Sequence, residues 1–168
     1  MVIIIMGVSG SGKTTVGQQL AADLDWIFSD GDDFHIEENI AKMRNGIPLT
    51  DEDRSGWLET LSQYIKKYII SEHNAVIACS ALKQQYRRKL QLDPKRVKFV
   101  YLKGSEALIK KRLQSRSGHF MQAELLESQF SALEEPEQAL FVDITHPPKQ
   151  ISATIQDFFC LSPRKTKQ

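Results

Sequence analysis

Residues 7–14 read Gly7-Val8-Ser9-Gly10-Ser11-Gly12-Lys13-Thr14 and match the phosphate-loop pattern G-x-x-x-x-G-K-[ST] in full. The apolar run at 2–6 before this stretch predicts a strand buried on both faces, and the apolar spacing after it predicts a helix over 13–24. This order of strand, glycine-rich turn and helix is the context in which backbone N–H groups surround the phosphates of a nucleotide. We therefore expect a nucleoside triphosphate site here.

Two side chains of this loop are expected to act on the triphosphate directly. Lys13 is expected to reach the β- and γ-phosphate oxygens, and the hydroxyl of Thr14 is expected to bind Mg²⁺. The remaining nucleotide contacts of the loop are expected from Gly7, Ser9, Gly10, Ser11, Gly12 and Thr15. The alternative is a Gly- and Ser-rich turn followed by Lys-Thr by chance.

The rest of the chain predicts how this unit is extended. Further apolar runs at about 26–28, 75–78, 97–102 and 139–144 predict strands. Helical spacing predicts helices at about 34–45, 50–71, 83–92, 106–114 and 151–159. Because strands alternate with helices, we expect an α/β fold with a five-stranded parallel sheet flanked by helices, formed by residues 1–168 as a single domain.

Charge and cysteine usage exclude several classes of protein. The chain has 22 Lys and Arg against 21 Asp and Glu, so its net charge of +1 offers no general attraction to nucleic acid or to an anionic membrane. No apolar stretch approaches the ~18 residues of a membrane span, and the opening apolar run lacks the basic flank of a secretory signal. Cys79 and Cys160 lie far apart without metal-like spacing, which predicts a reduced, cytoplasmic location.

A cluster of carboxylates, Asp30, Asp32 and Asp33, follows the second predicted strand, which lies beside the first strand in many sheets of this kind. A carboxylate at such a strand tip can hold a Mg²⁺-bound water or orient an acceptor hydroxyl for in-line attack on the γ-phosphate. We expect Asp30 on the metal side and Asp32 as the catalytic group that orients or deprotonates the acceptor. The alternative is that these residues only cap the next helix and form a turn.

Two absences favour a kinase over other triphosphate-binding proteins. The chain contains no N-K-x-D segment, with which GTP switches bind guanine. With 168 residues the chain is also short for an ATP-driven motor domain. A nucleotide site beside acceptor-side carboxylates therefore predicts phosphoryl transfer to a small molecule.

Short motifs occur along nearly the whole chain beyond the phosphate loop. They are Asp30-Gly31-Asp32-Asp33-Phe34-His35, Asn39 with Lys42-Met43, Gly46-Ile47-Pro48-Leu49, Asp51-Glu52-Asp53-Arg54 with Trp57-Leu58, Cys79-Ser80-Ala81-Leu82-Lys83 with Tyr86-Arg87, Arg112-Leu113 with Arg116, Gly118-His119-Phe120, and Ser128-Gln129 with Leu133-Glu134 and Pro136. With these motifs the chain resembles the gluconate kinases, phosphate-loop enzymes related to shikimate kinase and the nucleoside monophosphate kinases. The resemblance implies ATP-dependent phosphorylation of D-gluconate on its 6-hydroxyl, with ATP and Mg²⁺ as cofactors and a homodimer as the assembly.

A sugar acid needs cations for its carboxylate and hydrogen-bonding groups for its hydroxyls, and the chain offers both. The candidates for the carboxylate are Arg54, Lys83 and Arg87, and the candidates for the hydroxyls are Asp32, His35, Ser80 and Gln129, with Lys42 in support on one helical face with His35. Three of them, His35, Lys42 and Arg54, lie in a predicted substrate-binding helical segment at about 34–71. Each cation is also explained by a solvated helix face, and His35 by a surface histidine.

The resemblance also implies where the nucleotide base and a closing lid lie. Arg112 is expected to stack near the adenine, and the loop that contains His146 and Pro147 is expected to wrap around it. Arg116 is expected to touch the transferring phosphoryl group from a lid at about 116–135. That segment is polar and poor in predicted core residues, which suits a lid that excludes water.

Further expectations concern one lid residue, one helix face and the rival identities. His119, within the lid, is expected to contact substrate or phosphate, with an exposed histidine as the alternative. The apolar stripe at Trp57, Leu58, Leu61 and Ile65 is expected to be buried, and the resemblance implies that part of it is a dimer surface. Shikimate kinase is the main rival identity, and the absence of a Gly-Gly-Gly run after the third strand argues against it. A nucleotide-binding switch, the other rival, is disfavoured by the two lid arginines and the missing guanine motif.

Overall fold

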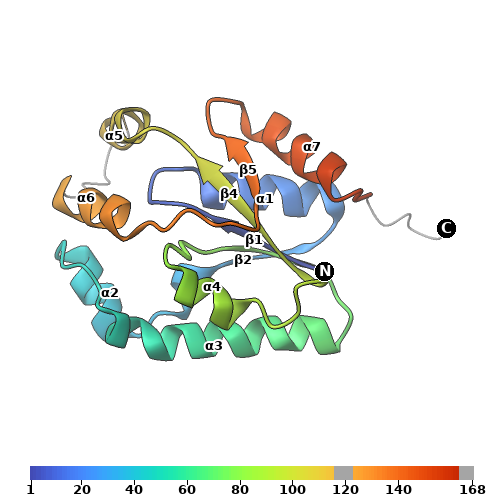
Figure 1. Ribbon diagram of the computed structural model, residues 1–168, viewed down its shortest axis with the longest axis horizontal. Coiled ribbons are helices and arrows are strands. Elements are labelled where there is room, and N and C mark those ends of the chain that lie inside the picture. The colour runs from blue at the N-terminus through green and yellow to red at the C-terminus, as the bar shows by residue number, and fades with distance from the viewer. Residues whose placement is uncertain (116–122, 163–168) are drawn as a thin grey trace.

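The computed structural model describes residues 1–115 and 123–162 of the chain (Figure 1). Its centre is a parallel five-stranded sheet in the order β2-β3-β1-β4-β5. The strands are β1 (Val2–Met6), β2 (Ile27–Asp30), β3 (Ala75–Ala78), β4 (Val97–Lys103) and β5 (Leu140–Asp143). The predicted fold class and the five-stranded parallel sheet are therefore confirmed.

Helices cover both faces of this sheet, as Figure 1 shows. One face is covered by α1 (Lys13–Leu24) and α7 (Pro148–Phe158), and the other by α3 (Asp51–Ile70) and α4 (Gln84–Leu90). Three more helices gather at the end of the sheet to which the strands' carboxyl ends point: α2 (Glu37–Arg44), α5 (Glu106–Gln114) and α6 (Ala123–Ala132). Ligands of open α/β sheets bind at this end, which makes it the place to look for a site.

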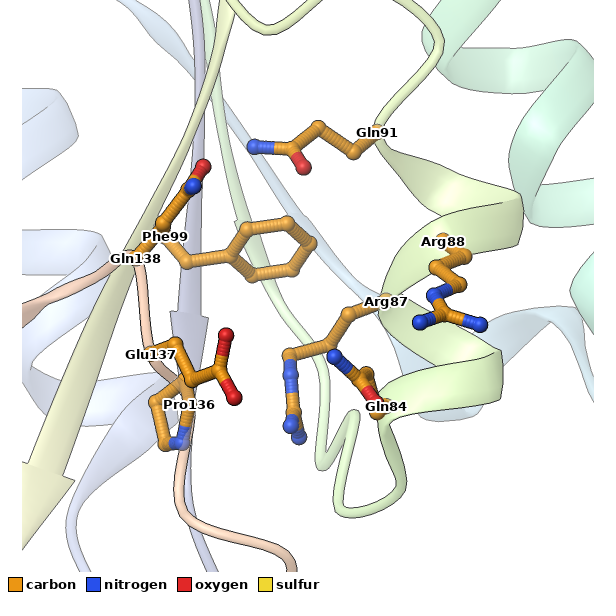
Figure 2. A pocket seen from close by; sticks show the side chains of 8 residues that line it. All are labelled: Gln84, Arg87, Arg88, Gln91, Phe99, Pro136, Glu137 and Gln138. Carbon is orange, nitrogen blue, oxygen red and sulfur yellow. The ribbon is translucent and has the colours of Figure 1, made fainter.

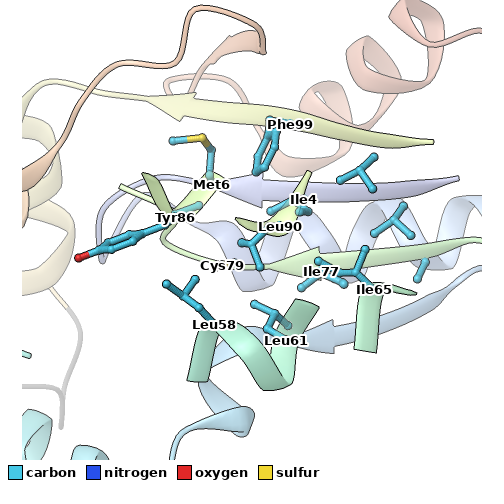
Figure 3. Packing of buried hydrophobic residues seen from close by; sticks show 14 of the residues in the cluster. Ile4, Met6, Leu58, Leu61, Ile65, Ile77, Cys79, Tyr86, Leu90 and Phe99 are labelled. Carbon is cyan, nitrogen blue, oxygen red and sulfur yellow. The ribbon is translucent and has the colours of Figure 1, made fainter. Parts of the chain in front are cut away.

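The core has two halves because β1 is buried on both faces. Ile4 and Met6 of β1 pack in one cluster with Leu58 and Leu61 of α3 (Figure 3), and Ile3 belongs to the cluster on the opposite face with residues of α1 and α7. Successive side chains of a strand point to opposite faces, so an unbroken apolar run supplies both clusters. This is why β1 lies at the centre of the sheet.

The apolar stripe of α3 lies inside this core. Trp57, Leu58, Leu61 and Ile65 are all buried within the single chain, with at most 2% of their surface exposed. The prediction of a buried stripe is confirmed. The prediction that part of it is a dimer surface is wrong, because these side chains are already covered by the sheet and α4.

The position of β2 corrects a second expectation. β3 lies between β2 and β1, so the second strand of the chain is not beside the first. The reason is exposure: all residues of β3 are buried, whereas Ile27 of β2 remains 51% exposed, and a partly exposed strand suits the edge of a sheet. The tip of β2 nevertheless lies level with the end of β3, because Asp30 is in register with Ala78.

The segment predicted as a lid is only partly described. Residues 116–122 lie outside the described part of the chain, so the placement of Arg116 and His119 is not tested. Within α6, Leu125 and Leu126 are buried, and Leu126 belongs to the core cluster of Ile3. The expectation that the segment is poor in core residues is therefore wrong for α6. Among the described residues, no helix combines the length and the apolar character that crossing a membrane requires.

Candidate active site

The phosphate loop lies between β1 and α1, and its backbone conformation depends on glycine. Gly10 and Gly12 have φ angles of +80° and +98°, in the left-handed region that residues with a Cβ rarely adopt. No atom lies within 4 Å of the position that a Cβ on Gly12 would take, so the space beside the start of α1 is open. The hydroxyl of Ser11 is buried and has no hydrogen-bond partner among the described residues. An unpartnered buried donor beside a helix N-terminus fits a phosphate group.

Lys13 and Thr14 lie at the start of α1 as predicted. The Lys13 ammonium donates a hydrogen bond to the backbone carbonyl of Val8 at 3.1 Å, so it lies over the loop. The Thr14 hydroxyl donates to the Asp30 carboxylate at 2.7 Å. The two residues expected at the metal are thus adjacent, although β3 lies between β2, which ends at Asp30, and β1, which leads into the phosphate loop. Thr15 is exposed on the first turn of α1.

Asp32 lies in the short 3-10 helix (Gly31–Phe34) that follows β2. Its backbone N–H donates to the Asp30 carboxylate at 3.1 Å, which fixes its position relative to the metal-side pair. Although part of the residue is exposed, protein atoms around the carboxyl group raise the pKa of Asp32 by desolvation, and the Lys13 ammonium partly offsets the rise. Asp32 and Lys13 therefore lie near enough for their charges to interact.

His35 is held against the ring of Trp57. The two rings are stacked with centroids 4.4 Å apart, and the indole N–H of Trp57 donates to the carbonyl of Gly31 at 2.7 Å. Burial, with the nearby charge of Arg54, lowers the pKa of His35 to about 4. The imidazole is therefore neutral at pH 7, with one buried nitrogen, Nδ1, that has no partner among the described residues. A neutral imidazole in this position can donate a hydrogen bond to a hydroxyl or accept one from it.

This shift predicts a pH-dependent loss of stability. The ordinary pKa of histidine is 6.5, so between about pH 6.5 and 4 the unfolded chain binds a proton at His35 that the folded chain does not bind. Stability should therefore fall as the pH drops through this window. Urea denaturation at pH 7.5 and pH 5 should show a smaller loss for His35→Gln than for the wild type. His73→Gln, at an exposed position, should behave as the wild type, and an unchanged loss in His35→Gln would contradict the assignment.

Two cations, Arg54 and Lys83, lie over the ring of Tyr86. The Arg54 guanidinium lies 5.7 Å from the centre of the Tyr86 ring and donates to the carbonyl of Leu49. The Lys83 ammonium donates to both carboxylate oxygens of Asp51, at 2.7 and 2.9 Å. Hydrogen bonds from Lys83 and Tyr86 hold the pKa of Asp51 at about 2. Lys83 is thus ion-paired, whereas the protein partner of Arg54 is an uncharged carbonyl.

The other two predicted cations make structural contacts. Lys42 forms an ion pair with Asp53 at 2.6 Å, and this contact ties α2 to the start of α3. Arg87 is buried, and its Nη1 donates to the carbonyls of Ala81 and Leu82 at 2.9 Å each. Figure 2 shows Arg87 inside a pocket between α4 and the segment that contains Pro136 and Glu137. This geometry does not favour Arg87 as a fork for a substrate carboxylate, which stays a prediction.

Ser80 and Gln129 both contact the phosphate loop. The backbone carbonyl of Ser80 accepts from Gly7 N–H at 3.3 Å, next to the end of β3. The carboxamide oxygen of Gln129, on α6, accepts from Ser9 N–H at 2.7 Å. Gln129 therefore lies on the nucleotide side of the site, and its predicted role with substrate hydroxyls stays a prediction.

The part of the site predicted to bind the adenine is built from α5 and the loop after β5. Arg112 donates to the carbonyl of Ile144, which ties α5 to this loop. His146 and Pro147 are exposed in the same loop, just before α7. The structure therefore brings Arg112 and the predicted adenine loop together.

Sequence reasoning overlooked Asp51 and Trp57. Both were named in a motif of the resemblance, but Asp51 was given no role in the site and Trp57 only a place in the buried stripe. In the structure Asp51 holds Lys83, and Trp57 holds His35. A signal for Trp57 was present, because it follows Arg54 by three residues and so lies on the same face of α3. The sequence carries no comparable signal for Asp51, whose partners lie more than thirty residues away.

Comparison with known proteins adds to this geometry. A family model described as shikimate kinase matches residues 9–156. The thermosensitive gluconokinase of Escherichia coli (strain K12) is 47% identical, over 85% of this chain and 79% of that protein. A sugar kinase from Janibacter sp. HTCC2649 has a TM-score of 0.90 at 40% identity, covering 99% of this chain and 98% of that chain. A gluconokinase from Sinorhizobium meliloti 1021 has a TM-score of 0.82 at 39% identity, with 95% of each chain covered.

Proposed function

This chain belongs to the gluconokinase family of phosphate-loop kinases, and from that premise we propose that it transfers the γ-phosphoryl group of ATP to the 6-hydroxyl of D-gluconate. The products are 6-phospho-D-gluconate and ADP. The observation that carries this proposal is the juxtaposition of the phosphate loop with Asp32 and, next to it, the cluster of His35 and Arg54. The homodimer and the cytoplasmic location stay predictions.

We assign the phosphates of ATP to the loop and the first turn of α1. The Ser11 hydroxyl and the backbone N–H groups before Lys13 supply donors, and the Lys13 ammonium supplies a positive charge toward the γ-phosphoryl oxygens. Because these donors are held in place by the positive-φ backbone, they need little reorganisation during transfer. Arg112 and the loop at His146 are assigned to the base.

Thr14 and Asp30 fit a Mg²⁺ ion that arrives with the nucleotide. A hydroxyl and a carboxylate are oxygen donors of the kind that Mg²⁺ prefers, and the 2.7 Å contact shows that the two groups reach the same point. When bound, the ion would neutralise charge on the β- and γ-phosphates. Thr14 and Asp30 are the residues that would hold the ion.

Three residues are assigned to the acceptor: Asp32, His35 and Arg54. Asp32 orients the 6-hydroxyl and accepts its proton as the oxygen attacks the γ-phosphorus, and the leaving ADP takes the P–O bonding electrons. The neutral imidazole of His35 hydrogen-bonds to another hydroxyl. Arg54 binds the carboxylate of gluconate because its charge is not matched by a carboxylate of the protein in the described contacts.

Arg54 provides a direct test of this assignment. Arg54→Met should raise the KM for gluconate by roughly 10- to 100-fold, the effect of losing a hydrogen bond to a charged group, and should leave the KM for ATP nearly unchanged. Turnover of a polyol that lacks the carboxylate should suffer much less. Arg88→Met, at an exposed position on α4, serves as the control. Equal losses on gluconate and on the polyol would contradict the carboxylate role.

The acceptor itself is tested by ADP release with a panel of substrates. Gluconate should give a higher kcat/KM than shikimate, polyols or nucleoside monophosphates. Shikimate is included because the matching family model carries that description. A preference for shikimate or for a nucleoside monophosphate would overturn the proposed function.

A further inference from the structure

The loop between β3 and α4 carries a strained residue. Ala81 has a φ of +44°, in the left-handed region that costs free energy for a residue with a Cβ, and its side chain is fully buried. Such backbone persists only where surrounding contacts hold it, and it occurs most often at functional sites. Ala81 follows Ser80, whose carbonyl contacts the phosphate loop, and comes two residues before Lys83, whose ammonium reaches Asp51.

Two side chains from outside the loop hold this conformation. Arg87 donates from Nη1 to the carbonyls of Ala81 and Leu82, both at 2.9 Å. Glu134 lies beyond α6, and its backbone N–H donates to the same Leu82 carbonyl at 2.9 Å. The Glu134 carboxylate accepts from the N–H of Gln84 at 2.5 Å, and this N–H is the first of α4.

Glu134 therefore caps α4 from a distant part of the chain. The N-cap residue of α4 is Lys83, which makes no side-chain cap of its own, and within residues 1–115 and 123–162 it is Glu134 that accepts the hydrogen bond of Gln84 N–H. A lysine ammonium has no hydrogen-bond acceptor and cannot cap this helix itself, and the Lys83 side chain is instead ion-paired with Asp51 at the start of α3. The start of α4 also positions Tyr86, on whose ring Arg54 lies.

We propose that Glu134 and Arg87 are positioning residues for acceptor binding: together they hold the strained 80–84 loop so that Lys83 and Tyr86 face Arg54. Neither needs to touch the substrate. The proposal rests on the proposed function, since it assigns the acceptor to the Arg54 side of the site. It goes beyond that function because the proposed reaction assigns Glu134 no contact with the nucleotide or the acceptor.

Glu134 is the better residue to change, because it is exposed whereas Arg87 is buried and its loss would disturb folding. Glu134→Ala removes the acceptor for Gln84 N–H, and Glu134→Gln keeps one. Glu137→Ala, at an exposed acid three residues later that lines the same pocket as Arg87, makes the same charge change and leaves the hydrogen bond from Gln84 N–H to Glu134 in place. The contacts of Glu134 and Arg87 with the 80–84 loop are called the clamp below. Ala81→Gly permits the positive φ at little cost in free energy, so it should reduce the need for the clamp.

The first measurement is amide hydrogen exchange of the peptide that covers 80–86, which needs no substrate. Exchange there should be faster by about 10-fold or more in Glu134→Ala, and close to wild type in Glu134→Gln and in Glu137→Ala. A peptide from α1 provides an internal reference. Unchanged exchange of the 80–86 peptide in Glu134→Ala would overturn the clamp itself.

The second measurement is steady-state kinetics with both substrates varied. Glu134→Ala should raise the KM for gluconate about 10-fold with the KM for ATP unchanged, Glu134→Gln should restore it, and adding Ala81→Gly to Glu134→Ala should lower it again. Three outcomes would each overturn the proposal. They are faster exchange without a change in the gluconate KM, equal rises in the KM values for gluconate and ATP, and no rescue by Ala81→Gly. A wild-type protein that does not phosphorylate gluconate would contradict the proposed function, whereas the exchange measurement would still decide whether the clamp exists.

Discussion

Lys13→Met is expected to lower kcat/KM by about 1,000-fold or more while leaving the fold intact, which corresponds to ~4 kcal/mol of lost transition-state stabilisation. The Lys13 ammonium lies over the phosphate loop against the Val8 carbonyl, at the start of α1 and outside both core clusters. Methionine keeps the aliphatic length and removes only the charge that meets the γ-phosphoryl group. We therefore expect the substitution to slow phosphoryl transfer without lowering the stability of the fold.

The measurement is an ADP-release assay with gluconate and ATP, accompanied by a thermal unfolding curve. Lys66→Met, at an exposed position of α3, is the matched control and should keep wild-type kinetics. A Lys13→Met protein that is folded and retains near wild-type turnover would show that the loop does not bind a triphosphate in the assigned way. A loss of activity that follows a large fall in Tm would likewise count against a purely chemical role.

Asp32→Asn is expected to lower kcat by roughly 100- to 10,000-fold, the usual contribution of a positioned general base, with little change in the KM for ATP. The amide keeps the size of the carboxylate but cannot accept the proton of the acceptor hydroxyl. Because burial raises the pKa of Asp32, the wild-type kcat should fall as the pH drops through that raised pKa, since the protonated carboxyl group cannot act as a base. This acidic limb should disappear from the residual activity of Asp32→Asn.

Asp33→Asn is the matched control for this change. Asp33 is the exposed neighbour in the same 3-10 helix, so the substitution alters the local charge equally without removing the base. Its kcat should stay close to that of the wild type. A loss in Asp32→Asn confined to the KM for ATP would instead place Asp32 on the metal side and move the acceptor role to another residue.

Local sequence was sufficient for the elements that form the nucleotide side. The predicted strand at 2–6 and helix at 13–24 coincide with β1 and α1, because a continuous apolar run, a glycine-rich turn and a regular apolar spacing are all properties of neighbouring residues. The phosphate loop followed from the same stretch. The proximity of Thr14 and Asp30 could also be predicted, since the carboxyl ends of parallel strands meet at one edge of a sheet.

The tertiary structure decided which charged groups face the acceptor. From the sequence, Arg54, Lys83 and Arg87 were the candidates for the carboxylate, with Lys42 in support beside His35. The fold gives each cation a different partner: a carbonyl for Arg54, Asp51 for Lys83, two loop carbonyls for Arg87 and Asp53 for Lys42. Residue spacing within one helix determines which side chains share a face. It carries no information on which distant element covers that face.

Contacts between distant segments also explain where the structure differs from the other sequence-based predictions. The placement of β3 between β1 and β2 depends on how much surface each strand leaves exposed once the helices have packed, and not on the order of the strands along the chain. Gln129 reaches Ser9 across 120 residues, and Glu134 caps α4 across 50. The sequence alone therefore determined the strand–loop–helix unit and its chemistry, because both depend on neighbouring residues. Only the packed chain determined the acceptor side, because hydrogen bonds between distant segments exist only after the core has brought those segments together.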